Sequence, residues 1–138
     1  MRSSRPMLLV EDDEVDIMTI SRVFKTLKIT NPLVLAYNGE DALTHLRSAQ
    51  TSRPCLILLD LNMPRMGGIE FLGIVKQDSN LRRIPVIVLT SSRAEQDLLA
   101  SFDHSVAGYI VKPADHTQFV DVVKTIDLYW TLSELSGE

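Results

Sequence analysis

Residues 55–64 read CLILLDLNMP, in which four apolar residues, 56–59, lead straight to Asp60 and a turn that contains Pro64. Similar apolar runs occur at four other places, residues 7–10, 33–37, 86–89 and 107–111. Four of the five runs show no polar alternation, which is typical of strands covered on both faces. Segments with helical periodicity follow them, at residues 14–28, 41–48, 68–76, 94–102 and 115–132. Because strand and helix alternate five times, the sequence predicts an α/β fold, a doubly wound (βα)5 domain with a five-stranded parallel sheet.

Size and composition favour one small domain. The chain has 138 residues, with 14 Lys and Arg against 18 Asp and Glu and a net charge of -4. We expect a single domain over residues 1–138, with its core at about 5–130 and a tail at 131–138. The acidic balance argues against a nucleic-acid partner. The first apolar run ends at Glu11, too early for a signal peptide or a membrane span, and the single Cys55 suits the cytoplasm.

Reactive side chains stand at the carboxyl ends of four of the five predicted strands. Ligands of open α/β sheets bind at this edge, so we expect these side chains to converge. They are Glu11 and Asp12 after the first run, Asp60 after the third, Thr90 after the fourth and Lys112 after the fifth. Five of the 18 acids fall within residues 11–16, so the acidity is concentrated at this edge.

This set of side chains suits phosphoryl chemistry at a metal site. Clustered carboxylates need a cation, and an all-oxygen ligand set favours Mg²⁺. A lysine can pair with a phosphoryl oxygen, Thr90 can donate its hydroxyl to the same group, and a carboxylate can act as the nucleophile. Asp60 is the best candidate nucleophile because it stands alone after a central strand. Each residue alone also fits a plainer role, as a helix-start acid or a turn residue, and it is their conjunction that favours a site.

The same residues carry a resemblance to a known family. The segments 8–13, 58–64, 88–91 and 109–113 together resemble the CheY-like receiver domain of two-component response regulators, over nearly the whole chain. The resemblance implies a flavodoxin-like strand order 2-1-3-4-5. It implies a signalling protein rather than an enzyme, one that assists its own phosphorylation and dephosphorylation. Gly67 departs from the family, in which Asp commonly precedes the glycine that is Gly68 here.

The resemblance also implies a role for each site residue. Asp60 would accept a phosphoryl group from the phosphohistidine of a sensor histidine kinase. Mg²⁺ would bind to Asp12, Asp60 and the carbonyl of Asn62, with Glu11 acting through water, and Asp13 and Glu14 would be helix-start acids. Lys112 would contact the phosphoryl group and precede a cis peptide bond to Pro113. Thr90 and Tyr109 would form the conformational switch.

A narrower likeness concerns the partners. Segments 31–33, 83–86 and 127–130 resemble single-domain receivers that are paired with phytochrome-type histidine kinases. The end of the last predicted helix carries the apolar residues Tyr129, Trp130, Leu132 and Leu135. They either pack on their own domain or form a homodimer through the fourth helix, fifth strand and fifth helix. We favour the dimer. The chain ends shortly after the fifth helix, so we expect no output domain and no direct DNA binding.

Two other classes of protein share part of this pattern of strand-end residues. Haloacid-dehalogenase-like phosphatases also use a strand-end aspartate, but they need a second aspartate two positions on, where this chain has Asn62, and their nucleophile follows the first strand. A receiver-like docking module that is never phosphorylated would be expected to have lost Asp60 or Lys112, and both are present.

Overall fold

The computed structural model describes residues 5–61, 63, 65–90, 106–113 and 115–137, although not the side chains of Thr90 or of residues 129–137. The predicted helix at 94–102 and the predicted metal ligand Asn62 lie outside this part of the chain. The described elements are β1 (Met7–Val10), α1 (Glu14–Thr26), β2 (Leu33–Ala36), α2 (Gly39–Arg47), β3 (Leu56–Leu59), α3 (Gly68–Gln77), β4 (Val86–Thr90), β5 (Gly108–Val111) and α5 (His116–Gly137).

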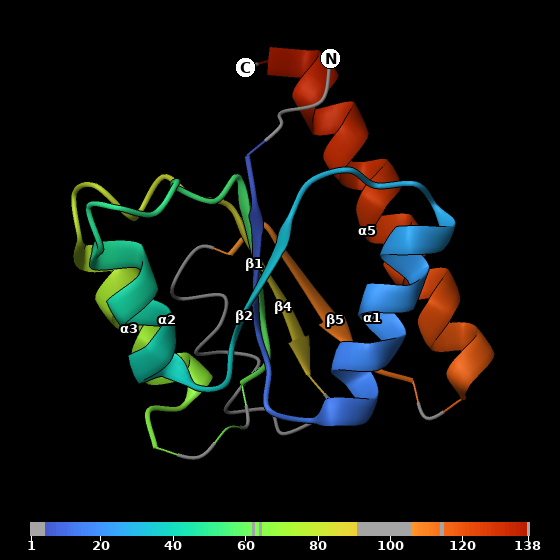
Figure 1. The fold of residues 1–138 in the computed structure, drawn as a ribbon, viewed down its shortest axis with the longest axis horizontal. Helices are drawn as coiled ribbons and strands as arrows, with labels where there is room; N and C mark the ends of the chain where they lie inside the picture. The colour runs from blue at the N-terminus through green and yellow to red at the C-terminus, as the bar shows by residue number, and fades with distance from the viewer. Residues whose placement is uncertain (1–4, 62, 64, 91–105, 114, 138) are drawn as a thin grey trace.

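The sheet has five parallel strands in the order β2-β1-β3-β4-β5, which confirms the predicted fold class and strand order. Helices α1 and α5 cover one face and α2 and α3 cover the other (Figure 1). Val10 pairs with Leu59 in the register of β1 and β3, so both central strands end at the same level. Glu11 and Asp60 directly follow these two strands, so they lie at the same edge of the sheet.

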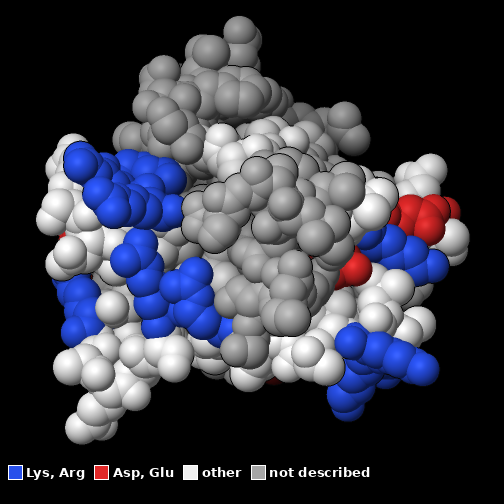
Figure 2. Space-filling model, turned by 90° about the horizontal axis from the view of Figure 1, so that it is seen from above, with Lys and Arg blue, Asp and Glu red and all other residues white. Residues whose placement is uncertain are grey.

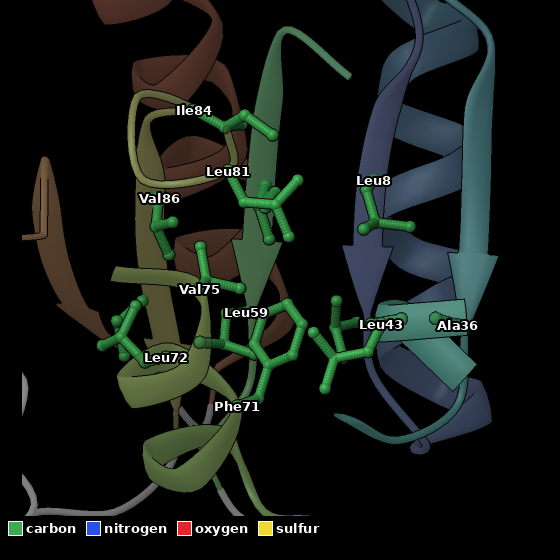
Figure 3. Close-up of a cluster of buried hydrophobic side chains, with 14 of the residues drawn as sticks. Leu8, Ala36, Leu43, Leu59, Phe71, Leu72, Val75, Leu81, Ile84 and Val86 are labelled. Carbon is green, nitrogen blue, oxygen red and sulfur yellow. The ribbon is translucent and has the colours of Figure 1, made fainter. Parts of the chain in front are cut away.

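Strand β3 is buried on both faces, which explains its lack of polar alternation. Ile57 and Leu59 face α2 and α3, where they pack with Phe71 and Leu72 (Figure 3). Leu56 and Leu58 face the opposite layer, formed by α1 and α5. All four strand side chains are fully buried, and each stabilises the fold by about 1.5–3 kcal/mol through the hydrophobic effect.

Helix α1 begins as a capped helix. The Asp13 side chain accepts hydrogen bonds from the backbone N–H groups of Val15, at 2.9 Å, and Asp16, at 3.1 Å. This confirms the prediction that Asp13 serves the helix start. The helix ends at Thr26 rather than at the predicted residue 28, because Lys28 adopts a left-handed backbone conformation with φ of 58°.

Charge is divided between the two ends of the sheet. Figure 2 looks onto the amino ends of the strands, where Lys and Arg outnumber Asp and Glu on the visible surface. The acids of residues 11–16 follow β1 at the opposite end. None of the described helices has the length and apolar character that crossing a membrane would need.

Candidate functional site

The carboxyl ends of β1 and β3 bring three carboxylates together. The backbone N–H of Asp60 donates to the Val10 carbonyl at 3.0 Å, and that of Glu11 donates to the Ala36 carbonyl at 2.9 Å, so hydrogen bonds to neighbouring strands hold both residues. Glu11, Asp12 and Asp60 each offer one carboxylate oxygen, and these oxygens lie within 4.8 Å of one another. Glu11 and Asp60 are buried, and Asp12 is exposed. The structure thus gathers the three predicted acids as expected.

Lys112 lies among the acids of this site. Its Nζ is 2.7 Å from Glu11 Oε1 and 3.9 Å from Asp60 Oδ1. It is also 2.6 Å from Asp16 Oδ2, a contact that the sequence analysis missed. Nothing in the sequence distinguished Asp16 from the other acidic residues at positions 11–16. The cap at Asp13, which fixes where α1 begins and so where its first turn lies, is the feature that could have singled it out.

The pKa values of Glu11 and Lys112 are both raised, but for different reasons. Burial of the Glu11 carboxyl, together with the Asp60 charge and despite the opposing Lys112 contact, raises its pKa from 4.5 to about 7. For Lys112, burial favours the neutral amine, but hydrogen bonds to Asp16 and Glu11 outweigh it and raise the pKa of the ammonium. Lys112 is therefore charged, and it does not fully offset the acids around it.

The residues present fit a divalent metal ion. The candidate ligands are carboxylate oxygens only, which suits Mg²⁺, Mn²⁺ or Ca²⁺ rather than zinc. Four acids, Glu11, Asp12, Asp16 and Asp60, lie around a single lysine, so the site carries excess negative charge. Burial is the main cause of the raised pKa of Glu11, the Asp60 charge adds to it, and a bound cation would offset that repulsion.

The structure tests the other predicted residues to different extents. Thr90 is the last residue of β4, paired with Val111 of β5, as expected from the sequence. Tyr109 lies in β5 opposite Val88, half-buried against the cluster that contains Leu59. Their roles as a switch stay predictions. The predicted cis bond before Pro113 is wrong: no cis peptide bond occurs in the described residues, and the bond has the trans form that X-Pro generally prefers.

The segment after Asp60 folds back closely on the site. The Gly68 N–H donates to the Leu61 carbonyl at 3.0 Å. A Cβ on Gly68 would lie 2.5 Å from the Asp60 carbonyl oxygen, so only glycine fits there. Gly39, at the start of α2, donates its N–H to the Met66 carbonyl at 3.0 Å. These contacts hold the loop that carries Met63 and Met66 against the end of the sheet.

Comparison with known proteins identifies the class that this fold and site define. The family model of the response regulator receiver domain matches residues 7–124, and the chain belongs to that family. It is thus a phosphoryl acceptor of two-component signalling, whose phosphoryl donor is a histidine kinase. This membership removes the phosphatase alternative.

Several of its relatives are themselves response regulators. Response regulator Rcp1 of Synechocystis sp. is 38% identical over 128 residues, which cover 90% of this chain and 87% of Rcp1. The crystal structure of the phosphorylated cyanobacterial phytochrome response regulator RcpA superimposes with a TM-score of 0.89 at 38% identity, covering 94% of this chain and 95% of RcpA. The crystal structure of Mn²⁺-bound Rcp1 gives a TM-score of 0.87 at 36% identity, covering 93% and 94% of the two chains.

The Glu11 pKa predicts how stability depends on pH in the metal-free protein. Because the folded state binds the Glu11 proton more tightly than the unfolded state, the stability present below about pH 4.5 is lost as the pH rises through about 7. The expected loss of unfolding free energy from Glu11 is up to about 3 kcal/mol.

Urea unfolding with a chelator at pH 5.5 and pH 8 measures this loss, and Glu11→Gln should remove most of the difference between the two pH values. A divalent ion should then stabilise the parent more at pH 8 than at pH 6. Equal pH dependence in both proteins would contradict the assignment.

Proposed function

We propose that Asp60 is the residue that accepts the phosphoryl group. The observation that supports this proposal is the position of Asp60 relative to the other charged side chains of the site. Asp60 follows the central strand β3, lies 3.9 Å from Lys112 Nζ, and offers an oxygen within 4.8 Å of oxygens of Glu11 and Asp12. A nucleophile, a cation and two further metal-ligand candidates thus meet at one point, as phosphoryl transfer requires.

In the proposed reaction an Asp60 Oδ atom attacks the phosphorus of the donor in line with the leaving atom. The new O–P bond forms as the bond from phosphorus to the donor's histidine nitrogen breaks, and that nitrogen keeps the electron pair. Lys112 donates a hydrogen bond to an oxygen of the transferred group, and its charge offsets part of the negative charge there. Asp12, Asp60 and the Asn62 carbonyl would hold Mg²⁺, with Glu11 acting mainly through water, and the ion would supply positive charge to the same oxygens.

The response to phosphorylation is proposed to pass through Thr90 and Tyr109. Thr90 ends β4 beside β5, which carries Tyr109 and leads to Lys112. A Thr90 hydroxyl that moved towards the phosphoryl group would leave space that the half-buried Tyr109 ring could enter. We propose further that the kinase is of the phytochrome type, because the relatives at 38% identity include a protein described as a phytochrome response regulator.

Incubation with acetyl phosphate and Mg²⁺, followed by intact-mass measurement, tests the proposed function. The expected result is the addition of one phosphoryl group, lost when a chelator removes the metal. An unchanged mass under both conditions would favour the alternative of a docking module that is never phosphorylated.

We also infer that the protein forms a homodimer through α5, β5 and the fourth helix that the sequence predicts at residues 94–102. Leu128 of α5 is 60% exposed, and the helix continues beyond it to Gly137 through the apolar residues of the tail. An exposed apolar side chain in a helix whose sequence continues apolar favours burial against a second copy. A chain truncated after Asp127 should give half the mass of the parent in light scattering. An unchanged mass would contradict the dimer.

A further inference from the structure

The Lys112 ammonium is held from two different elements. Glu11, at the end of β1, accepts a hydrogen bond at 2.7 Å, and Asp16, in the first turn of α1, accepts one at 2.6 Å. An ammonium has three N–H groups, so these two carboxylates leave one for another acceptor. The third carboxylate, Asp60, is 3.9 Å away, beyond hydrogen-bond distance. An oxygen of a phosphoryl group bound to Asp60 could accept the remaining N–H.

The geometry points to Asp16 as a positioning residue for phosphoryl transfer, one that holds Lys112 so that its remaining N–H faces the phosphoryl group on Asp60. This inference rests on the proposed function of Asp60. A lysine side chain has four rotatable carbon bonds and loses much rotamer freedom when its charge must stand in one place. A second charged acceptor fixes the ammonium before the reaction begins, which lowers the entropy lost in the transition state.

Asp16 suits this task better than Glu11 does alone. Glu11 belongs to the candidate metal-binding group, so a bound metal ion would compete with the lysine for its carboxylate. Asp16 is outside that group, and its side chain is 21% exposed on the outer side of a lysine that is 9% exposed. The backbone of Asp16 is itself fixed, because its N–H donates to the Asp13 cap at 3.1 Å. Asp16 therefore provides a rigid anchor that metal binding does not occupy.

Asp16→Asn tests the inference, with Asp13→Asn as the matched control. Asp13→Asn removes one charge from the start of the same helix and keeps a good helix cap. The described ion pairs of Lys112 are with Glu11, Asp16 and Asp60, not with Asp13. With acetyl phosphate and saturating Mg²⁺, Asp16→Asn should slow the initial rate of labelling by about five- to tenfold. Asp13→Asn should change it by less than about twofold, and Asp16→Glu, which keeps the charge, should recover part of the rate.

A double-mutant cycle separates positioning from a structural effect. If Asp16 acts through Lys112, Asp16→Asn should have no further effect on the rate in a Lys112→Ala background. An equal slowing with and without Lys112, or an equal slowing by Asp13→Asn and Asp16→Asn, would overturn the inference.

A measurement on the metal-free protein distinguishes failure of this inference from failure of the proposed function. In ¹H–¹⁵N spectra of the lysine ammonium groups, Lys112 of the parent and of Asp13→Asn should show a signal protected from exchange with water. Asp16→Asn should lose that protection. An equally protected signal in Asp16→Asn would overturn the inference, whatever the labelling assay shows. If the Lys112 signal loses protection in Asp16→Asn but the parent protein never gains a phosphoryl group, the result would instead count against the role of Asp60.

Discussion

Asp60→Asn should abolish the addition of a phosphoryl group while the protein stays folded. The amide has nearly the size of the carboxylate, but its nitrogen and oxygen are poor nucleophiles, so no O–P bond can form at this position. Intact-mass measurement with acetyl phosphate and Mg²⁺ should show the parent gaining one group and the variant gaining none. Asp121→Asn, a change of the same type at an exposed position of α5, should label as the parent does.

The same variant should change the electrostatics of the site. The Asp60 charge contributes to the raised pKa of Glu11, so its removal should bring that pKa down towards its usual value. The metal-free variant should therefore resist urea better than the parent at pH 8, where the parent holds several ionised acids close together. Labelling of Asp60→Asn at the parent's rate, or a loss of stability at pH 8, would contradict the account of this site.

Gly68→Ala should destabilise the fold and disturb Asp60 directly. The new Cβ would lie 2.5 Å from the Asp60 carbonyl oxygen and 2.6 Å from the Leu61 Cα. Both are backbone atoms, so they cannot rotate away, and either α3 or the end of β3 must move. We expect a loss of about 3 kcal/mol in the free energy of unfolding and slower labelling of Asp60.

Gly67→Ala is the matched control for this prediction. A Cβ at position 67 would meet its nearest atom, the Leu61 carbonyl oxygen, at 3.6 Å, which is ordinary contact. Gly67 also has a φ of -73°, which alanine adopts readily. Urea unfolding of the two variants should separate them by more than about 2 kcal/mol. Equal stabilities would mean that the backbone approach at Gly68 is looser than the structure describes.

The sequence predicts much of the fold because its apolar runs are short, unbroken and buried on both faces. The run 56–59 shows this, since its side chains fill both layers of the core. It also predicts which elements deliver Glu11, Asp60 and Lys112, because parallel strands that end at one level bring their next residues to one edge.

The sequence could not predict how these groups pair once they meet. The Asp16 contact depends on where α1 begins and on how its first turn lies over β5, which is a tertiary property. The trans bond before Pro113 was missed for a different reason, because the expectation came from the family resemblance and not from the residues. The placement of Gly68 against the Asp60 carbonyl is likewise a matter of backbone packing, which the sequence does not predict.

Chemical trapping of the phosphorylated residue tests the central claim most directly. Borohydride reduces an aspartyl-phosphate to homoserine, so peptide mapping after labelling and reduction identifies the carboxylate that carried the phosphoryl group. The account predicts homoserine at position 60, in the peptide that contains CLILLDLNMP, and only when Mg²⁺ was present during labelling. Homoserine at Asp12 or Asp16, or none at position 60 in a protein that has gained a phosphoryl group, would contradict it.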